Sequence, residues 1–378
     1  MKITNYYFNE QGVSNKELDL HKEDSLILIF GNNMEIFQKV VEQFNSKNIL
    51  GCSSSGEIVE DQLLEEGLSV TVLEFKDTKV KTSLVHFKDY DDSYNAGVEV
   101  MKNLNAEKLK GILVFSEGLN INGSKLVEGM ESLNLNNSVI GGGTAGDYLK
   151  FNETWVYYNN KKYNNAIVAV GLYGENLNIS FGSASGITAL GVEKKITSSS
   201  KNVLYTIDDK RALDVYKEWF KGFGIEDIEG LLLQCPIEIS KNFNQEEGLV
   251  RTPIAYNEEE GSVTFTGEIP EGKFLRMMRA DVEKMIEASH SAVKSSMEKL
   301  NKEKESNVLN LMVSCAGRKA LLGTETEDEL IEANQITEDA NSKQIGFYSY
   351  GEFTNVNNKS EFVNQTMTVI SIEEKKVA

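Results

Sequence analysis

The 378-residue sequence is poor in the residues that build covalent or metal-held scaffolds, with only 3 cysteines, 3 histidines and 3 prolines. Cys52, Cys235 and Cys315 are odd in number and far apart, which argues against a disulfide framework and favours a reducing compartment. The histidines are isolated, and no cluster of His and Cys has the spacing of zinc ligands. We therefore expect no structural metal and no cofactor.

Basic charge and long apolar runs are also scarce. The chain has 39 Lys and Arg against 58 Asp and Glu, a formal net charge of −19. Such a surface repels phosphate backbones and anionic lipids. No window approaches the ~20 consecutive apolar residues of a membrane span, and the N-terminus lacks the apolar segment of a secretory signal. We expect a cytoplasmic protein that neither binds nucleic acid nor inserts into a membrane.

The sequence does contain alternating strand-like and helix-like segments. Residues 24–30 form a short apolar run typical of a buried strand, and Asn33 is placed to cap a helix with apolar residues spaced by three and four up to residue 44. Antiparallel hairpins are predicted at 67–87 and 262–278. We predict a mixed α/β fold with substantial antiparallel content, in which helices cover mixed β-sheets.

The length favours two domains, because 378 residues are too many for one ordinary hydrophobic core. A polar run at 197–210 interrupts the alternation of strands and helices. We predict two linked domains, residues 1–205 and 206–378.

Small and polar residues follow four of the apolar strands, at 51–57, 141–147, 314–318 and 346–352. Strand-end loops on a rigid sheet are where ligand sites concentrate. Glu57 and Glu352 each follow a glycine directly. We predict that these loops meet at one polar cavity.

The loop at 141–147 formally satisfies the pattern G-x-G-x-x-G. Dinucleotide binding requires a helix to begin there, because the pyrophosphate lies at a helix N-terminus. The residues that follow are strand-like, so we reject nucleotide binding. Asp147 either binds an ammonium group or closes a turn.

Two arginines are candidate partners for an anion. The guanidinium group of Arg318 suits a carboxylate, and the alternative is an ion pair with an acidic residue at 323–330. Arg251 lies inside an apolar strand and needs a partner, either a structural carboxylate or a ligand anion. A bound amino acid would place its carboxylate on one of these arginines and its ammonium group on Asp147 or a glutamate.

An enzyme is the alternative hypothesis, a thiol-dependent hydrolase or transferase that uses Cys52 or Cys315. A nucleophilic thiol needs a lowered pKa or an adjacent histidine. No histidine stands in a loop of catalytic character. We therefore expect a protein that is not an enzyme. A scaffold without a small ligand is the third hypothesis, and it predicts a filled interdomain cleft.

Five of these segments, in this order along the chain, resemble motifs of the FIST proteins (F-box and intracellular signal transduction). The segments are GCSSSGEI (51–58), VIGGGTAGDYLKF (139–151), LVRTP (249–253), SCAGRKALLG (314–323) and GFYSYGE (346–352). The resemblance implies an N-terminal and a C-terminal FIST domain with a sensory role.

The resemblance also implies a small ligand, with amino acids among the candidates. It implies a separate partner that reads the signal, such as a histidine kinase, a chemoreceptor or a cyclic-di-GMP enzyme of bacteria. The residues it singles out for ligand binding are Ser53, Ser54, Glu57, Gly142, Asp147, Arg251, Arg318, Tyr350 and Glu352.

Overall fold

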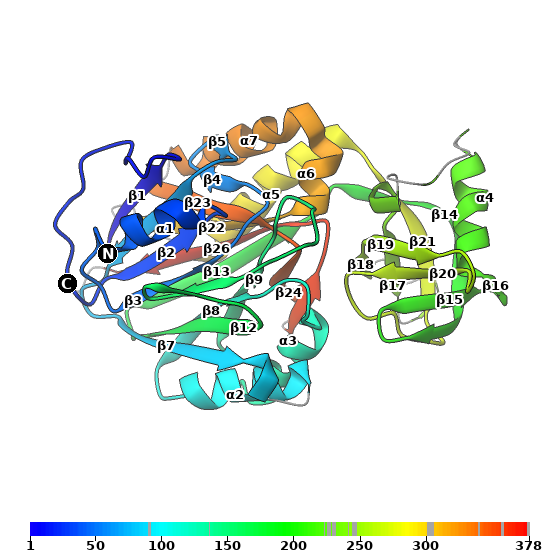
Figure 1. Ribbon diagram of the computed structural model, residues 1–378, viewed down its shortest axis with the longest axis horizontal. Helices are drawn as coiled ribbons and strands as arrows, with labels where there is room; N and C mark the ends of the chain where they lie inside the picture. Colours follow the sequence, from blue (N-terminus) through cyan, green and yellow to red (C-terminus); the bar gives the residue numbers. More distant parts are fainter. Residues whose placement is uncertain are drawn as a thin grey trace.

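A larger and a smaller lobe make up the molecule (Figure 1). The structure is a computed structural model that describes residues 1–89, 92–135, 137–222, 224, 228, 232–240, 242–243, 248–300, 306–338, 341–356 and 359–375. The described residues of 187–280 form the smaller lobe, and the described residues before and after them form the larger one.

Three six-stranded sheets build the larger lobe. The first has the order β1 (Lys2–Phe8), β6 (Leu68–Glu74), β2 (Leu26–Phe30), β3 (Asn48–Cys52), β10 (Val156–Tyr158) and β11 (Lys161–Tyr163). The second has the order β7 (Lys79–His86), β12 (Ala166–Tyr173), β8 (Leu109–Ser116), β9 (Val139–Thr144), β24 (Gly351–Val356) and β25 (Lys359–Val363). The third has the order β13 (Leu177–Ala184), β26 (Met367–Glu374), β22 (Val308–Cys315), β23 (Ser342–Ser349), β4 (Glu57–Val59) and β5 (Gln62–Leu64).

The three sheets follow one design and make the larger lobe a threefold repeat. Each contains one parallel pair, β2 with β3, β8 with β9, or β22 with β23, and its other described pairings are antiparallel. The repeats follow one another along the chain, at 2–74, 79–173 and 177–374. In each repeat, the second parallel strand is followed by a hairpin that pairs with the edge of another repeat's sheet. The hairpin β4–β5 joins the third sheet, β10–β11 joins the first and β24–β25 joins the second. This exchange closes a cycle among the three repeats.

A glycine occupies the same place in every parallel pair. Gly51, Gly142 and Gly346 lie opposite residues 29, 114 and 312, respectively. A Cβ atom at any of the three would overlap the carbonyl oxygen of the residue opposite. The common register of these glycines supports the equivalence of the repeats, because the close approach of the two backbones excludes every side chain there.

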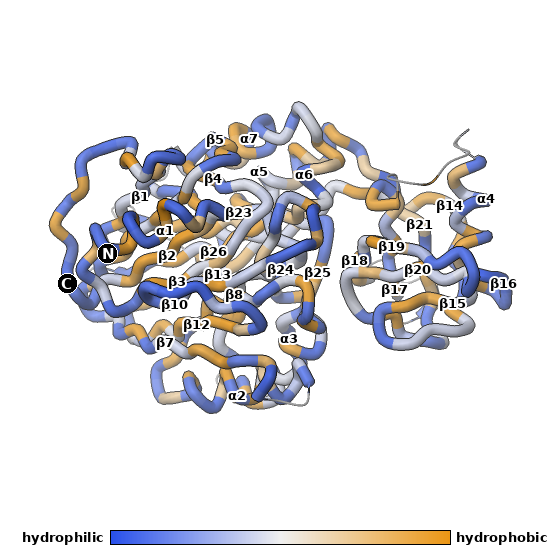
Figure 2. The backbone as a smooth tube through the Cα atoms, viewed as in Figure 1, coloured by the Kyte–Doolittle hydropathy of each residue, from blue (hydrophilic) through white to orange (hydrophobic). Residues whose placement is uncertain are grey.

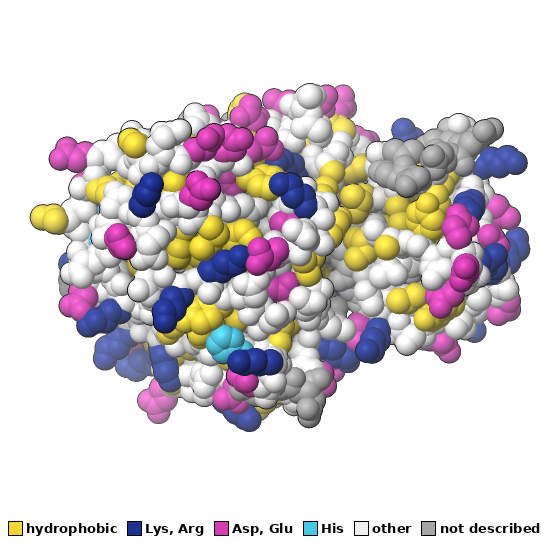
Figure 3. Space-filling view, in the orientation of Figure 1, with side chains coloured by type: hydrophobic (Ala, Val, Ile, Leu, Met, Phe, Trp, Pro, Cys, Tyr) yellow, Lys and Arg dark blue, Asp and Glu magenta, His cyan; other side chains and the backbone are white. Residues whose placement is uncertain are grey.

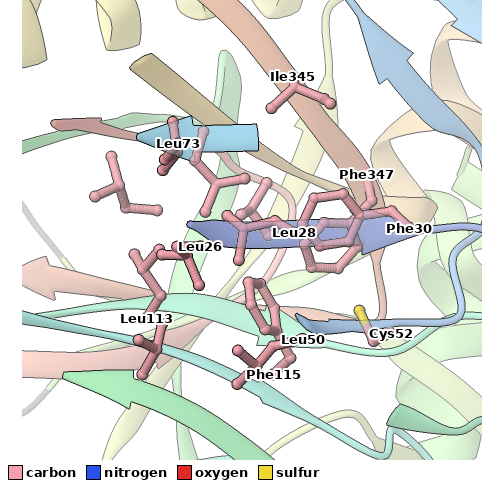
Figure 4. Close-up of a cluster of buried hydrophobic side chains, with 14 of the residues drawn as sticks. Leu26, Leu28, Phe30, Leu50, Cys52, Leu73, Leu113, Phe115, Ile345 and Phe347 are labelled. Atoms are coloured by element: carbon pink, nitrogen blue, oxygen red, sulfur yellow. The ribbon is translucent and has the colours of Figure 1, made fainter. Parts of the chain in front are cut away.

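The inner faces of the three sheets meet in one hydrophobic core (Figures 2 and 4). Phe30 from the first sheet stacks on Phe347 from the third, with ring centroids 4.6 Å apart. Phe115 from the second sheet contacts both rings edge-on, at 5.3 Å and 5.9 Å. Apolar burial from all three repeats therefore holds the lobe together.

Helices cover the outer face of each sheet. They are α1 (Met34–Val41) on the first sheet, α2 (Ser93–Leu104) and α3 (Gly123–Glu131) on the second, and α5 (Val282–Leu300) and α7 (Thr326–Glu338) on the third. The predicted cap is confirmed, because the side chain of Asn33 accepts from the backbone N–H groups of Glu35 and Ile36. Three shorter helical turns are η1 (Phe87–Asp89), α6 (Ala316–Leu322) and η3 (Gly323–Glu325).

The smaller lobe is an insertion into the third repeat, between β13 and α5. Its strands are β14 (Ile187–Ser200), β15 (Val203–Ile207), β16 (Lys210–Arg211), β17 (Ile237–Ser240), β18 (Leu249–Arg251), β19 (Pro253–Asn257), β20 (Ser262–Phe265) and β21 (Phe274–Ala280). They form one antiparallel sheet, and α4 (Ala212–Gly222) and η2 (Leu232–Gln234) pack on it around a separate core. The predicted boundary at 205/206 falls within β15.

The predicted fold class, mixed α/β with several mixed sheets, is confirmed. Both predicted hairpins are wrong. Strands β6 and β7 belong to successive repeats and lie in different sheets, and β20 and β21 pair with other strands. The turn after β6 is held by Glu374, whose carboxylate accepts from the backbone N–H groups of Lys76, Asp77 and Thr78. Burial alone would raise the pKa of Glu374, but these hydrogen bonds lower it to about 2.

Within the described part of the chain, every helix is too short or too polar to cross a membrane.

The glycine register gives a test of the repeat. Gly346→Ala should lower the free energy of unfolding by ~3 kcal/mol or more, because a backbone carbonyl cannot move aside for the new methyl group. Gly174→Ala in the same lobe is the control, since its Cβ would meet only ordinary contacts of 3.5 Å and longer. Urea unfolding followed by circular dichroism measures both, and equal stability of the two variants would contradict the register.

Candidate functional site

The strand-end loops that the sequence singles out do meet in space. The backbone N–H of Gly146 donates to the carbonyl of Ser53 at 3.0 Å, and that of Tyr350 donates to Thr144 at 3.3 Å. These bonds join loops from all three repeats at the carboxyl ends of the parallel strands, the edge at which α/β sheets place their ligands.

Glu57 and Glu352 occupy equivalent positions in this assembly. Both side chains are fully buried, and each accepts a hydrogen bond from the serine three residues before it, Ser54 and Ser349. Burial raises the pKa of each carboxyl group to about 8, although the hydrogen bonds oppose the shift. Neither forms an ion pair with a described residue, and Oε2 of Glu57 accepts no hydrogen bond from the described chain. Both glutamates are therefore largely protonated near neutral pH.

Asp147 closes its own loop. Its carboxylate accepts from the backbone N–H groups of Phe151 at 3.0 Å, Asn152 at 2.7 Å and Glu153 at 3.0 Å, and from the hydroxyl of Tyr350. The side chain is buried, and its oxygens are occupied. Of the two roles predicted for Asp147, the structure shows the closing of a turn. The carboxylate of Asp147 is therefore not free to bind the ammonium group of a ligand.

Ser53 and Gly142 are structural. The hydroxyl of Ser53 accepts from the backbone N–H of Trp155 at 3.1 Å and is fully buried. Gly142 is the glycine of the second parallel pair, with φ +136°. Neither residue reaches a cavity, so these two predicted site residues hold the loops together instead.

Arg318 is neutralised by the protein itself. Its Nε donates to Glu329 Oε2 at 2.6 Å, and both side chains are fully buried. The remaining nitrogens donate to the carbonyls of Ser185 and Met285. The ion pair with an acidic residue of the segment 323–330 is therefore present, and Arg318 is not available to a ligand carboxylate.

Arg251 is buried to 3% exposure and forms no ion pair with a described carboxylate. Its guanidinium donates to the carbonyls of Glu268 at 3.3 Å, Val250 at 3.0 Å and Phe362 at 2.9 Å, and to the hydroxyl of Ser124 at 3.3 Å. A guanidinium has five N–H groups, so one is left without a partner in the described chain. Burial lowers the pKa of Arg251 to about 10, which still leaves it charged at neutral pH.

Arg251 lies in a groove between the lobes with a volume of about 680 Å3, here named the Arg251 groove. Helix α3, strand β25 and the smaller lobe line it. Its charged residues are Glu128, Glu131, Arg251, Glu268, Lys359 and Glu361. The buried hydroxyl of Ser360 also lines it and makes no hydrogen bond to the described residues. The acids do not form a metal site, since no described group of three or more His, Cys, Asp or Glu is arranged to hold an ion.

A second hollow, the strand-end cavity, lies where the smaller lobe covers the carboxyl ends of β8, β9, β22 and β23. Thr144, Cys315 and Tyr350 line it from the larger lobe, and Thr252 and Phe265 line it from the smaller lobe. Three of the four loops singled out in the sequence therefore contribute to one cavity, although Tyr350 is the one predicted site residue that does so.

Burial raises the pKa of Cys315 to about 12, with a further contribution from the charge of Glu352. Burial outweighs the backbone N–H groups of Gly317, Arg318 and Gln365, which act to lower the pKa of the Cys315 thiol. Burial also raises the pKa of Cys52 well above its usual value, and Cys52 packs in the central core. A thiol that stays protonated at neutral pH is a poor nucleophile.

Comparison with known proteins agrees with these features. The model of the FIST N domain matches residues 25–210, and that of the FIST C domain matches residues 212–355. The chain belongs to the FIST family. FIST domains are sensory and signalling domains by prediction, which gives this FIST protein its general class.

The uncharacterized protein MJ1623 of Methanocaldococcus jannaschii is 23% identical over 357 residues, 84% of this FIST protein. The chain spans about 66% of the length of this relative. Among solved structures, cyanuric acid hydrolase from A. caulinodans is 11% identical, with 79% of this chain and 100% of that chain covered and a TM-score of 0.17. A similarity this low carries no argument about fold or activity.

Several residues that connect the two lobes of this FIST protein were not singled out from the sequence. Thr252, Asn364 and Gln365 link the lobes: Gln365 donates to Thr252 at 3.2 Å, and Asn364 accepts from Thr266 at 2.6 Å. The polar triplet 364–366 directly before the last apolar strand was the available signal. Its partners lie about 100 residues away in the sequence, beyond the reach of any local pattern.

The two buried glutamates predict how the stability of this FIST protein depends on pH. The folded pKa of Glu352 lies above that of an unfolded glutamate, so its contribution to stability is complete below about pH 4 and is lost as the pH rises through about 8. As the pH rises from about 5 to 8, we expect the free energy of unfolding of Glu352→Gln to increase relative to that of the wild type by roughly 1 kcal/mol per pH unit.

Urea midpoints at several pH values measure this gain, with Glu283→Gln on the surface of α5 as the control for losing one negative charge. A constant difference between Glu352→Gln and the wild type across the range would contradict a protonated Glu352.

The protonation state of the Cys315 thiol gives a second test of this site. With a pKa of about 12, its thiol should react with iodoacetamide at pH 8 at least 100-fold more slowly than free cysteine. Mass spectrometry of the native protein, with a urea-unfolded sample as the control for full labelling, measures the rate. Labelling of Cys315 faster than free cysteine would support the thiol-dependent enzyme instead.

Proposed function

We propose that this FIST protein is a cytoplasmic sensory protein that binds a free amino acid in the Arg251 groove and does not transform it. The observation that carries the proposal is the buried guanidinium of Arg251, which lacks a carboxylate partner in the described chain and borders a groove between the lobes.

A ligand carboxylate would complete the surroundings of Arg251. A buried charge is costly unless it is paired, and here backbone carbonyls and one hydroxyl supply only partial compensation. The free N–H and the unpartnered hydroxyl of Ser360 are donors suited to carboxylate oxygens. Binding of an anion would therefore reduce the free-energy cost of burying the charge of Arg251.

The other end of the ligand should carry positive charge. Four glutamates line the groove, at 128, 131, 268 and 361, and they outnumber the cations Arg251 and Lys359 of the lining and Lys125, which pairs with Glu128 and Glu268. An ammonium group is attracted to such a rim, and a second negative charge is repelled. The groove thus favours neutral and basic amino acids over acidic ones.

A sensory role agrees with the place of the groove. Its walls come from both lobes, so a bound ligand would contact both and favour one arrangement of them. A separate partner, such as a histidine kinase, a chemoreceptor or a cyclic-di-GMP enzyme, would read that arrangement. The open groove also argues against a scaffold with a filled cleft.

Calorimetric and thermal-shift screens of the twenty amino acids test the proposal. We expect at least one neutral or basic amino acid to raise the melting temperature in proportion to the logarithm of its concentration. Arg251→Gln should weaken its binding at least tenfold, because a charge-assisted pair is lost. Arg279→Gln in the same lobe should bind normally, since Arg279 is exposed and outside the groove.

Failure of every amino acid to bind the folded wild type would refute the amino-acid ligand. Unchanged binding by a folded Arg251→Gln variant would refute the site. Circular dichroism of each variant establishes that it is folded.

A further inference from the structure

The strand-end cavity differs from the Arg251 groove in size and in the charge of its lining. Its volume is about 120 Å3, against about 680 Å3 for the groove. It lies over the ends of two parallel strand pairs and is covered by the smaller lobe (Figure 1). A hollow at this edge of a sheet is the usual place for a small ligand.

The lining of the cavity carries no charge in the described chain. Its apolar walls include Leu119, Phe151, Ile254, Phe265 and Phe362. Hydrophobic side chains also gather along the junction of the two lobes in Figure 3. A charged ligand packed against these walls would lose part of its hydration without gaining a counter-charge, so the walls favour an uncharged molecule.

A few polar groups stand among these apolar walls. The thiol of Cys315 and the hydroxyls of Thr144 and Thr252 belong to lining residues. The ring of Phe151 stacks on that of Tyr350, with centroids 5.0 Å apart and planes 24° from parallel. Such a set suits a molecule with a flat apolar body and one or two hydrogen-bonding groups.

Gln365 supplies an independent sign of a missing partner. Its side chain is fully buried, and its amide nitrogen donates to Thr252 at 3.2 Å. The same nitrogen lies close to Gly317, so the carboxamide sits between two lining residues of the cavity. Its oxygen Oε1 accepts no hydrogen bond from the described chain. Buried amide oxygens are normally paired, and this unpaired one belongs to a side chain that lies next to two residues of the cavity wall.

We propose that the strand-end cavity is a second binding site, specific for an uncharged organic molecule of about the size of one aromatic ring that carries a hydrogen-bonding group. The volume agrees with this size, because an apolar cavity of about 150 Å3 binds benzene. Neither the family match nor the amino-acid proposal assigns a ligand to this cavity.

The second site stands independently of the Arg251 groove. The two share one wall, since Phe362 lines the cavity and its carbonyl oxygen accepts a hydrogen bond from Arg251. Their charge differs, because the groove is rich in carboxylates and the cavity lining has none in the described residues. Ligands of the two sites should therefore belong to different chemical classes.

Three isosteric probes test the proposal: neutral benzamide, anionic benzoate and cationic benzamidine. Ligand-observed NMR and isothermal calorimetry on the full chain should show benzamide binding at least tenfold more tightly than either ion. Ile254→Trp should weaken benzamide binding at least tenfold by filling the cavity from the smaller lobe. Leu119→Trp, which fills it from the larger lobe, is the second variant. Val192→Trp, at an exposed position outside the cavity, is the control and should bind normally.

Each outcome of these binding experiments either supports or overturns the second site. Absence of benzamide binding to the wild type, binding of benzoate or benzamidine as tight as that of benzamide, or undiminished binding by a folded Ile254→Trp or Leu119→Trp variant would overturn the proposal. Benzamide binding that survives in Arg251→Gln but is lost in the cavity-filling variants would support it, whether or not any amino acid binds the groove.

Discussion

The larger lobe depends on three close contacts between neighbouring backbones, one in each parallel strand pair. At Gly51, Gly142 and Gly346 the absence of a side chain lets the second strand lie against a carbonyl of the first. The second strand then passes a hairpin to another sheet, so every repeat holds an edge of its neighbour. No repeat can complete its own sheet, and the three fold as one body around the shared aromatic contacts of Phe30, Phe115 and Phe347.

This arrangement also explains why most of the polar loop residues are unavailable to ligands. The exchange brings the loops of different repeats into contact at the strand ends, and buried polar groups there must be satisfied. Asp147 binds the backbone of its own loop, Arg318 binds Glu329, and Ser53 binds the backbone next to β10. Among the predicted site residues, Arg251 keeps one N–H without a partner in the described chain at the junction between the lobes, and Oε2 of Glu57 is unpartnered at the strand ends.

Local features could be predicted from the sequence, and long-range ones could not. The cap at Asn33 depends on residues within one helical turn, so spacing alone revealed it. The repeat left two short traces, the glycine in the second parallel strand of all three parts and the serine and glycine that precede both Glu57 and Glu352, but the three parts otherwise share little sequence. The hairpin predicted at 67–87 was wrong because the alternation of apolar and polar residues identifies a strand but does not show which strand it pairs with. The state of Arg251 depends on Phe362, 111 residues away, which no pattern could reveal.

The smaller lobe leaves and rejoins the same repeat through paired strands, with Ile187 opposite Ala280 at the base of β14 and β21. It is joined covalently to the larger lobe by a two-stranded ribbon, and the hydrogen bonds of Thr252 with Gln365 and of Thr266 with Asn364 also hold it in place. Any reorientation of the lobe would therefore bend or twist this ribbon and would have to break those hydrogen bonds.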